Sequence, residues 1–170
     1  MDYSPSVVDT SLAAMQQAVI DSINSMSAGD YAAIVKFNST NPNRASVVRS
    51  FTRIDGGTGT AALVTAVKLD YPGRESNILD AVAVSVGQFA APPVPLPAGP
   101  RAIVLITDGT EDNSSADFNV ALQSAIDHNV SIFTVGVGDF TSTTSQRILN
   151  NLPRETGGDF YPTSGPATIS

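Results

Sequence analysis

The stretch Ala102-Ile103-Val104-Leu105-Ile106-Thr107-Asp108-Gly109 decides the fold of this chain. Its first part is an unbroken apolar run, which is typical of a strand that is covered on both faces within a parallel sheet. Residues 130–137 form a second, nearly continuous apolar run. Between the two runs, Phe118, Leu122 and Ile126 recur at helical spacing. A strand, a helix and a strand in this order indicate a parallel sheet with helices packed against it.

The flanking sequence continues the alternation of helices and strands. Apolar residues at three- and four-residue steps predict helices, and short branched runs bounded by Gly, Asn or Pro predict strands. The expected helices cover residues 10–28 with Asp9 or Thr10 as N-cap, 61–69 where a strand is the alternative, 77–89, and 145–152 before Pro153; the expected strands are 32–37, an edge strand at 46–54 hairpinned to it, and 157–161. We therefore predict an α/β fold, a doubly wound, mostly parallel sheet flanked by helices, in a single domain over residues 1–170.

Composition narrows the functions that this domain can have. The chain has 170 residues with 9 Lys+Arg against 16 Asp+Glu, a formal net charge of −7, and no block of basic residues that would neutralise phosphates. Nucleic acid and anionic membranes are therefore poor partners, and no apolar run is long enough to span a bilayer. The absence of cysteine excludes disulfides and thiolate metal sites. Charged residues make up 15% of the chain, against about 25% in an average domain, which hints at a secreted or envelope protein.

Polar residues at strand ends and helix starts mark the expected ligand site. In an open α/β sheet, ligands bind beyond the carboxyl ends of the strands. Asp108 follows the strand that ends at Ile106, Asp2, Ser4 and Ser6 stand in a loop before the first helix, and Ser76 precedes another helix. Each serine alone is more often a helix cap, and Asp108 alone is often a turn residue. Together, two carboxylates and three hydroxyls form an all-oxygen set that suits a hard divalent cation.

At these residues the chain resembles the von Willebrand factor A domains, whose metal-ion-dependent adhesion site uses the same elements in the same order. Asp2-Tyr3-Ser4-Pro5-Ser6 matches the Asp-x-Ser-x-Ser loop of that family, and Leu105-Ile106-Thr107-Asp108-Gly109 matches the segment after its fourth strand. Arg74-Glu75-Ser76 stands where the family commonly has Gly-Gly-Thr, so that Ser76 replaces the threonine. Phe133-Thr-Val-Gly-Val-Gly138 and Gly157-Gly158-Asp159-Phe160 are similar to the fifth and last strands. The resemblance covers nearly the whole chain.

The resemblance implies a metal-dependent binding module. Ser4, Ser6 and Ser76 would offer hydroxyl oxygens to Mg²⁺ or Mn²⁺, and Asp2 and Asp108 would bind it directly or through water. A carboxylate from an Asp or Glu of a protein partner would fill the open coordination position. By the same resemblance, we expect a role in adhesion or assembly at an extracellular or cell-surface location of bacterial type. We expect no enzymatic activity, because no histidine or lysine can be placed at the rim as a general base.

Departures from the family pattern define the alternatives. Only Met1 precedes Asp2, where the family has a central strand, and little follows Tyr161, where it has a last helix. We therefore expect a piece of a longer protein, or a strand supplied by another chain. Glu75 is a candidate to ligate the metal or to repel an acidic ligand. Glu111 and Asp112 are expected to form a solvated helix entrance, with an extension of the acidic site as the alternative. If the altered segment before Ser76 has lost the metal, the domain is a structural or assembly scaffold with a degenerate site.

Overall fold

The computed structural model describes residues 1–38, 44–73, 75–112, 114–137 and 142–163, in which helices and strands alternate along the chain. Their order is α1 (Pro5–Ser25), β1 (Tyr31–Phe37), β2 (Ala45–Arg53), α2 (Thr58–Lys68), α3 (Ile78–Ala90), β3 (Arg101–Thr107), α4 (Phe118–Asp127), β4 (Val130–Val137), α5 (Thr143–Gln146), a π-helical turn (Arg147–Asn151), α6 (Leu152–Thr156) and β5 (Phe160–Thr163).

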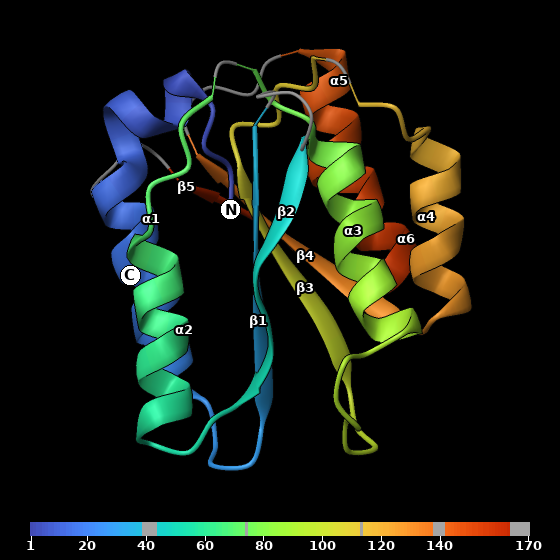
Figure 1. Ribbon diagram of the computed structural model, residues 1–170. Coiled ribbons are helices and arrows are strands. Elements are labelled where there is room, and N and C mark those ends of the chain that lie inside the picture. Colours follow the sequence, from blue (N-terminus) through green and yellow to red (C-terminus); the bar gives the residue numbers. More distant parts are fainter. Residues whose placement is uncertain (39–43, 74, 113, 138–141, 164–170) are drawn as a thin grey trace.

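The strands form a layer with helices on both sides, as the sequence predicts (Figure 1). Strands β3, β4 and β5 make a parallel three-stranded sheet in this order, with Ile103 beside Ile132 and Val135 beside Tyr161. Strands β1 and β2 are an antiparallel pair, which confirms the expected hairpin. Helices α1 and α2 lie on one side of the strands, and α3, α4 and α6 lie on the other. The predicted α/β class is therefore correct.

Two apolar cores lie between the helices and the strands. The core under α1 and α2 contains Met15, Leu63 and Val67, each with an exposed fraction of 0%. The core under α3, α4 and α6 contains Ile78, Ile132 and other buried residues of the helices and of β3 and β4. Burial of large aliphatic side chains contributes about 1.5–3 kcal/mol per residue to folding. These cores hold the strand ends, and therefore the candidate site, in a fixed frame.

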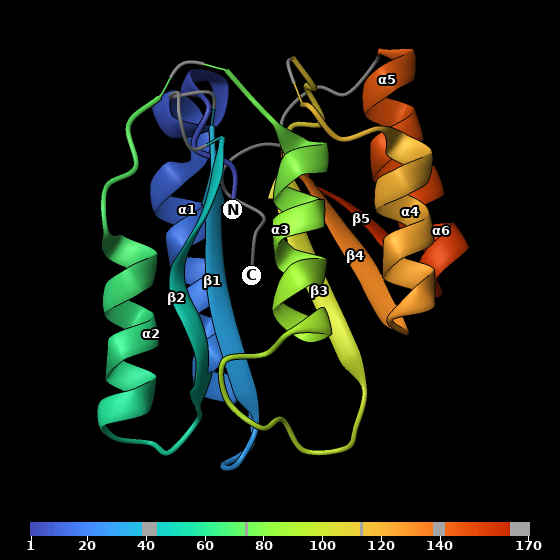
Figure 2. The same cartoon turned by 45° about the vertical axis from the view of Figure 1, so that its right-hand side comes forward.

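Residues Met1–Tyr3 lie between β1 and β3 and join the two groups of strands. The Asp2 amide donates to the Ile106 carbonyl at 3.0 Å, and the Tyr3 amide donates to the Phe37 carbonyl at 2.9 Å. Along the rest of their length β1 and β3 are not paired with each other in the described residues, and the two strands diverge there (Figure 2). The expectation that the strand at 102–106 is covered on both faces is wrong for its first half, because Ala102 is exposed and Val104 is 59% exposed.

Element boundaries differ from the sequence prediction, and three of the differences have a clear physical cause. Helix α1 begins at Pro5 instead of residue 10, because proline is well suited to the first helical position, where no amide partner is needed. Asp9 and Thr10 are therefore inside the helix and not its cap. The helix predicted to end before Pro153 continues through it to Thr156, since Pro153 lies in the first turn of α6. The last strand starts at Phe160, not at residue 157, because Gly157 adopts a left-handed conformation, φ 78°, and ends α6.

Candidate metal site

Asp2 is the buried centre of the candidate site. Its side chain is 0% exposed and accepts hydrogen bonds on both oxygens. Oδ1 accepts from the Ser4 amide at 2.8 Å, and Oδ2 accepts from the Thr107 hydroxyl at 2.7 Å and from the Ser76 hydroxyl at 3.2 Å. These contacts bring the chain start, the end of β3 and the segment before α3 to one carboxylate.

A second line of hydrogen bonds runs from Ser4 to Asp108. The hydroxyls of Ser4 and Ser6 are 3.2 Å apart, and the Ser6 hydroxyl donates to Asp108 Oδ2 at 2.5 Å. Ser4 is buried, Asp108 is half-buried and Ser6 is exposed, so this side of the network reaches the surface. The structure thus brings together all five residues that the sequence predicts: Asp2, Ser4, Ser6, Ser76 and Asp108.

The turn after β3 sets the direction of Asp108. Gly109 has φ 78°, and a Cβ there would lie 2.9 Å from Leu149 Cδ1, so that both conformation and space require glycine. The Gly109 amide donates to the Thr107 hydroxyl at 3.0 Å, and the Thr110 amide donates to Asp108 Oδ1 at 2.8 Å. These bonds close the turn and fix the carboxylate at the edge of the sheet.

Thr107 is a residue of the network that the sequence prediction left out of the site. It is 0% exposed, and it both accepts from the Gly109 amide and donates to Asp2. The sequence pattern of a strand followed by Thr107-Asp108-Gly109 could have revealed it. A hydroxyl at a strand end, next to a candidate metal ligand, is well placed to orient another ligand by a hydrogen bond.

The electrostatics of the site favour a cation. Burial raises the pKa of Asp2 to about 6, hydrogen bonds from Thr107 and Ser4 oppose this shift, and the nearby Asp108 carboxylate adds to it. Lys36 is a buried base close to the loop, with its ammonium 4.4 Å from the centre of the Tyr3 ring. That ammonium donates to the carbonyls of Val67 and Leu69 at the end of α2, so it is not the counterion of Asp2. A positive charge at the rim would offset the two carboxylates.

The donor set fits a hard divalent cation. It consists of carboxylate and hydroxyl oxygens, which Mg²⁺ and Mn²⁺ prefer over nitrogen and sulfur ligands. In the part of the chain that the structure describes, no group of three or more His, Cys, Asp or Glu side chains is arranged to hold a metal. A cation bound at Asp2 and Asp108 would therefore depend on serine hydroxyls for part of its coordination.

Glu111 and Asp112 lie at a helix entrance, as expected, but the helix is α3 and not the next helix along the chain. Asp112 is exposed and Glu111 is half-buried, and their carboxylates accept from backbone amides at the start of α3. Asp112 Oδ2 accepts from the Ser76 amide at 2.7 Å, and Glu111 Oε2 accepts from the Ile78 amide at 2.8 Å. Sequence periodicity contains no information on such a contact between distant segments. Arg74 lies outside the described residues, and a metal role for Glu75 stays a prediction.

Comparison with known proteins gives one family and one fold. The model of the von Willebrand factor type A domain matches residues 1–163. No curated protein matches the chain in sequence. No helix in the described part of the chain is both long and apolar enough to cross a membrane.

Several solved structures share the fold at low sequence identity. A von Willebrand factor type A protein from Catenulispora acidiphila is 22% identical, with a TM-score of 0.81 over 99% of this chain and 38% of its own. BatB from Bacteroides thetaiotaomicron is 14% identical, with a TM-score of 0.70 over 95% of this chain and 86% of its own. Proximal thread matrix protein 1 from the mussel byssus, with a zinc-occupied MIDAS motif, is 17% identical, with a TM-score of 0.75 over 100% of this chain and 43% of its own. This chain therefore spans less than half the length of the first and third of these proteins.

Proposed function

The chain belongs to the von Willebrand factor type A domain family, and we propose on that premise that it is a metal-dependent protein-binding module. Domains of this family are commonly protein-interaction modules and generally not enzymes. In our proposal the hydroxyls of Ser4, Ser6 and Ser76 bind Mg²⁺ or Mn²⁺, and Asp2 and Asp108 bind it directly or through water. The bound cation would supply a positive centre that attracts a carboxylate from a partner protein.

The observation that carries the proposal is the single hydrogen-bonded network that joins the five residues. Ser76 donates its hydroxyl proton to Asp2, and Ser6 donates its proton to Asp108. A hydroxyl that gives its proton to a carboxylate directs oxygen lone pairs away from that carboxylate, and lone pairs are what a cation binds. The carboxylates therefore orient the hydroxyls, and their two negative charges balance a divalent ion.

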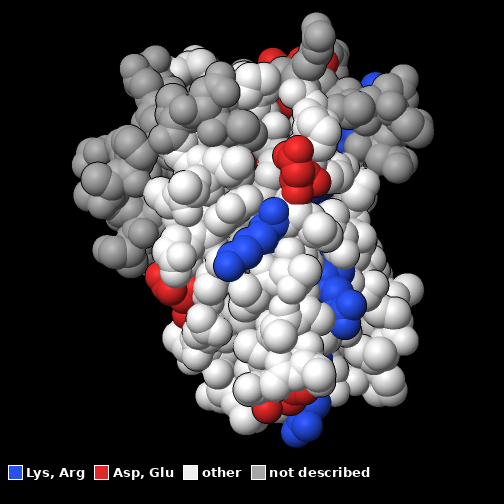
Figure 3. All heavy atoms as spheres, turned by 60° about the vertical axis from the view of Figure 1, so that its left-hand side comes forward, with Lys and Arg blue, Asp and Glu red and all other residues white. Residues whose placement is uncertain are grey.

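A bound cation would help this acidic chain to accept an acidic partner group. The protein carries a net charge of −7, so its overall field disfavours an Asp or Glu side chain, and a cation at the rim would supply a local positive centre. On the face drawn in Figure 3, the basic side chains are few and separated by uncharged surface, which gives no support to nucleic-acid binding. We propose adhesion or assembly at an extracellular or cell-surface location as the setting, in keeping with the frequent extracellular location of the family.

A second candidate function is a scaffold with a degenerate site. The observation in its favour is that Asp2 accepts three hydrogen bonds from the protein itself. A carboxylate with these partners is stabilised without any metal. The charged Arg74-Glu75 pair before Ser76, in place of the glycines of the family, points in the same direction.

Calorimetric titration of Mg²⁺ and Mn²⁺ separates the two functions. Wild type is expected to bind one ion per chain, and Asp108→Ala is expected to abolish saturable binding while the protein stays folded. Asp55→Ala is the matched control, since Asp55 is an exposed carboxylate that belongs to the α2 helix start and not to the network. Absence of binding to folded wild type would reject the metal proposal and favour the scaffold.

A further inference from the structure

The start of α3 is joined to residues 111, 112 and 114–116 by hydrogen bonds that run in both directions. The Asp112 carboxylate accepts from the Ser76 amide at 2.7 Å, and the Asp112 amide donates to the Ser76 carbonyl at 3.0 Å. Residue 76 is thus held through both of its backbone polar groups by one partner, Asp112. Residue 112 is four positions after Asp108, so the segment that carries one candidate ligand holds the backbone of another.

Glu111 extends this contact to the first turn of the helix. Its Oε2 accepts from the amides of Ile78 at 2.8 Å and Leu79 at 3.1 Å, and its Oε1 accepts from the Ser114 amide at 2.8 Å. The first amides of a helix have no partner within the helix, and a carboxylate there is favourable to the helix dipole. Glu111 therefore fixes the start of α3 relative to the loop after β3.

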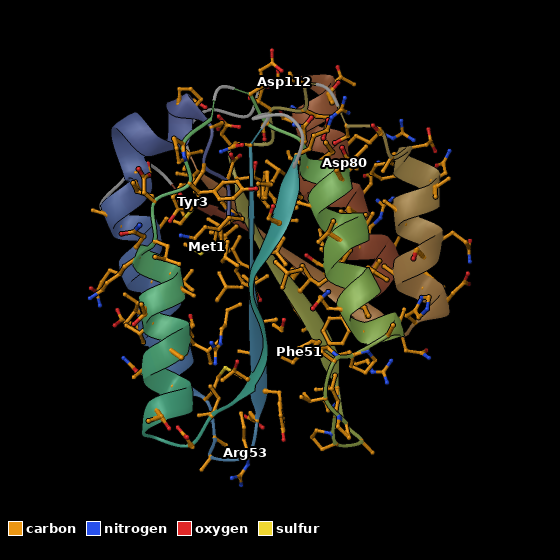
Figure 4. The ribbon with its side chains drawn as sticks, viewed as in Figure 1. Met1, Tyr3, Phe51, Arg53, Asp80 and Asp112 are labelled. Atoms are coloured by element: carbon orange, nitrogen blue, oxygen red, sulfur yellow. The ribbon has the colours of Figure 1, made fainter. Side chains whose placement is uncertain are left out.

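Asp80 returns the contact from the helix side. Its carboxylate accepts from the amides of Ser115 at 3.0 Å and Ala116 at 2.8 Å. The Asp80 amide in turn donates to the Ser114 hydroxyl at 3.2 Å. Figure 4 shows Asp80 and Asp112 at the same end of the molecule, at the top of α3. The two segments are joined at successive points and not by one bond.

We propose that Asp112 and Glu111 are positioning residues of the metal site, which act by holding Ser76 so that its hydroxyl stays on Asp2. This inference rests on the proposed metal-binding function. Asp112 Oδ2 accepts from the Ser76 amide, and both oxygens of Glu111 accept from backbone amides. In this proposal the two residues therefore act on the cation through Ser76 and the start of α3, and not as ligands. The contact also links Ser76 to the Asp108 segment, so that the second and third elements of the site keep one relative position before a cation arrives.

Mn²⁺ titration of Asp112 variants tests this role. Asp112→Ala is expected to weaken Mn²⁺ binding about tenfold, the lower end of the range for groups that orient metal ligands. Asp112→Asn keeps a carbonyl oxygen that can accept from the Ser76 amide, so it is expected to stay within about threefold of wild type. Equal losses in the two variants would mean that the charge of Asp112 acts on the ion directly, and would overturn the positioning role.

A double-mutant cycle shows whether Asp112 acts through Ser76. Ser76→Ala removes the hydroxyl, and in that background Asp112→Ala is expected to weaken binding by less than about twofold, because there is no ligand left to position. Additive losses would overturn the inference. Asp55→Ala, which removes a carboxylate from the start of α2, is expected to leave Mn²⁺ affinity unchanged even if its melting temperature falls as much as that of Asp112→Ala.

Two further readouts keep the test decisive. If Asp112→Ala does not fold, Glu111→Gln, which keeps one acceptor oxygen, takes its place in the test. We expect Glu111→Gln to weaken Mn²⁺ binding by roughly threefold to tenfold. Wild-type affinity in Glu111→Gln would contradict the role of Glu111. Amide hydrogen exchange is expected to accelerate at Ser76 in Asp112→Ala and to stay unchanged at Gly57 and Gly59. If wild type binds no Mn²⁺, the proposed function fails and this inference fails with it; if wild type binds and the Asp112 and Glu111 variants bind equally well, only this inference fails.

Discussion

At the start of both α2 and α3, a carboxylate accepts hydrogen bonds from backbone amides. At α2 this capping carboxylate is close to the helix in the chain, and at α3 it is distant. At α2, Asp55 accepts from the amides of Gly57 at 2.8 Å, Gly59 at 3.1 Å and Thr60 at 3.2 Å, all within five residues of it in the chain. At α3, the corresponding acceptor is Glu111, which is 33 residues away from Ile78. A local cap stabilises its own helix, whereas a distant cap also fixes the position of one segment relative to another.

The two helix starts lie at opposite ends of the molecule. Arg53, close in sequence to Asp55, lies at one end of the strand layer, and Asp112 lies at the other end with the candidate site (Figure 4). The α2 start is exposed and touches none of the site residues through the hydrogen bonds described above. The same chemistry, a carboxylate that accepts from helix amides, stabilises a helix locally at α2 and fixes a helix start relative to the candidate site at α3.

Replacement of the distant cap is expected to have the largest effect on stability. Glu111→Ala leaves the amides of Ile78, Leu79 and Ser114 without their acceptor, and each partly buried unsatisfied donor costs about 1–3 kcal/mol. We expect the free energy of unfolding to fall by about 3 kcal/mol in urea titrations, because water compensates part of the loss. A change below about 1 kcal/mol would mean that the α3 start does not depend on the distant segment.

Gly59→Ala perturbs the local cap through sterics. A Cβ on Gly59 would lie 2.4 Å from the Arg53 carbonyl oxygen and 3.2 Å from Asp55 Oδ2, so the backbone of the turn must move. We expect a loss of about 1–3 kcal/mol, the usual range for overpacking, with no change in Mn²⁺ affinity. A weaker Mn²⁺ affinity would show that the α2 start is coupled to the site and would break the comparison.

Acidification acts on the α2 start through Asp55. Hydrogen bonds from the Gly57, Gly59 and Thr60 amides lower the pKa of Asp55 from 3.8 to about 2. A lowered carboxyl pKa stabilises the folded state above pH 3.8, and this stabilisation is lost as the pH falls from 3.8 to 2. We expect Asp55→Asn to flatten the dependence of the melting temperature on pH in this window. An unchanged pH profile in the variant would contradict the cap.

The smallest effect is a stabilisation within α3. A Cβ on Gly87 would meet nothing within 4 Å, and the residue is exposed in the interior of the helix. Gly87→Ala is expected to raise the free energy of unfolding by roughly 0.5–1 kcal/mol, because alanine has the higher helix propensity. Mn²⁺ affinity should not change, since the start of α3 is already fixed from outside. A gain in affinity would show that fraying of α3 limits the position of Ser76.

The two helix starts also explain how much the sequence could predict. The helices, the hairpin and the sheet follow from periodicity, and the five candidate ligands follow from polar residues at strand ends and helix starts. At α2 the capping carboxylate of Asp55 is adjacent to its helix in the chain, so a local sequence pattern can contain the signal for it. The role of Glu111 at α3 was missed because only the folded chain brings residues 111 and 78 together. The exposure of Val104 was missed for the same reason, since an apolar run does not show whether a neighbouring strand covers it.

Mn²⁺-induced broadening of amide signals in NMR spectra of the folded protein tests the central claim most directly, because it locates the ion instead of only counting it. If Asp2, Ser4, Ser6, Ser76 and Asp108 form one metal site, the amide signals of Ser4, Ser76 and Thr110 will broaden at the lowest Mn²⁺ concentrations, and those of Gly57 and Gly59 will persist. Broadening that is strongest at the amides of Gly57 and Gly59, or equal broadening of the amides next to all exposed carboxylates, would contradict the claim.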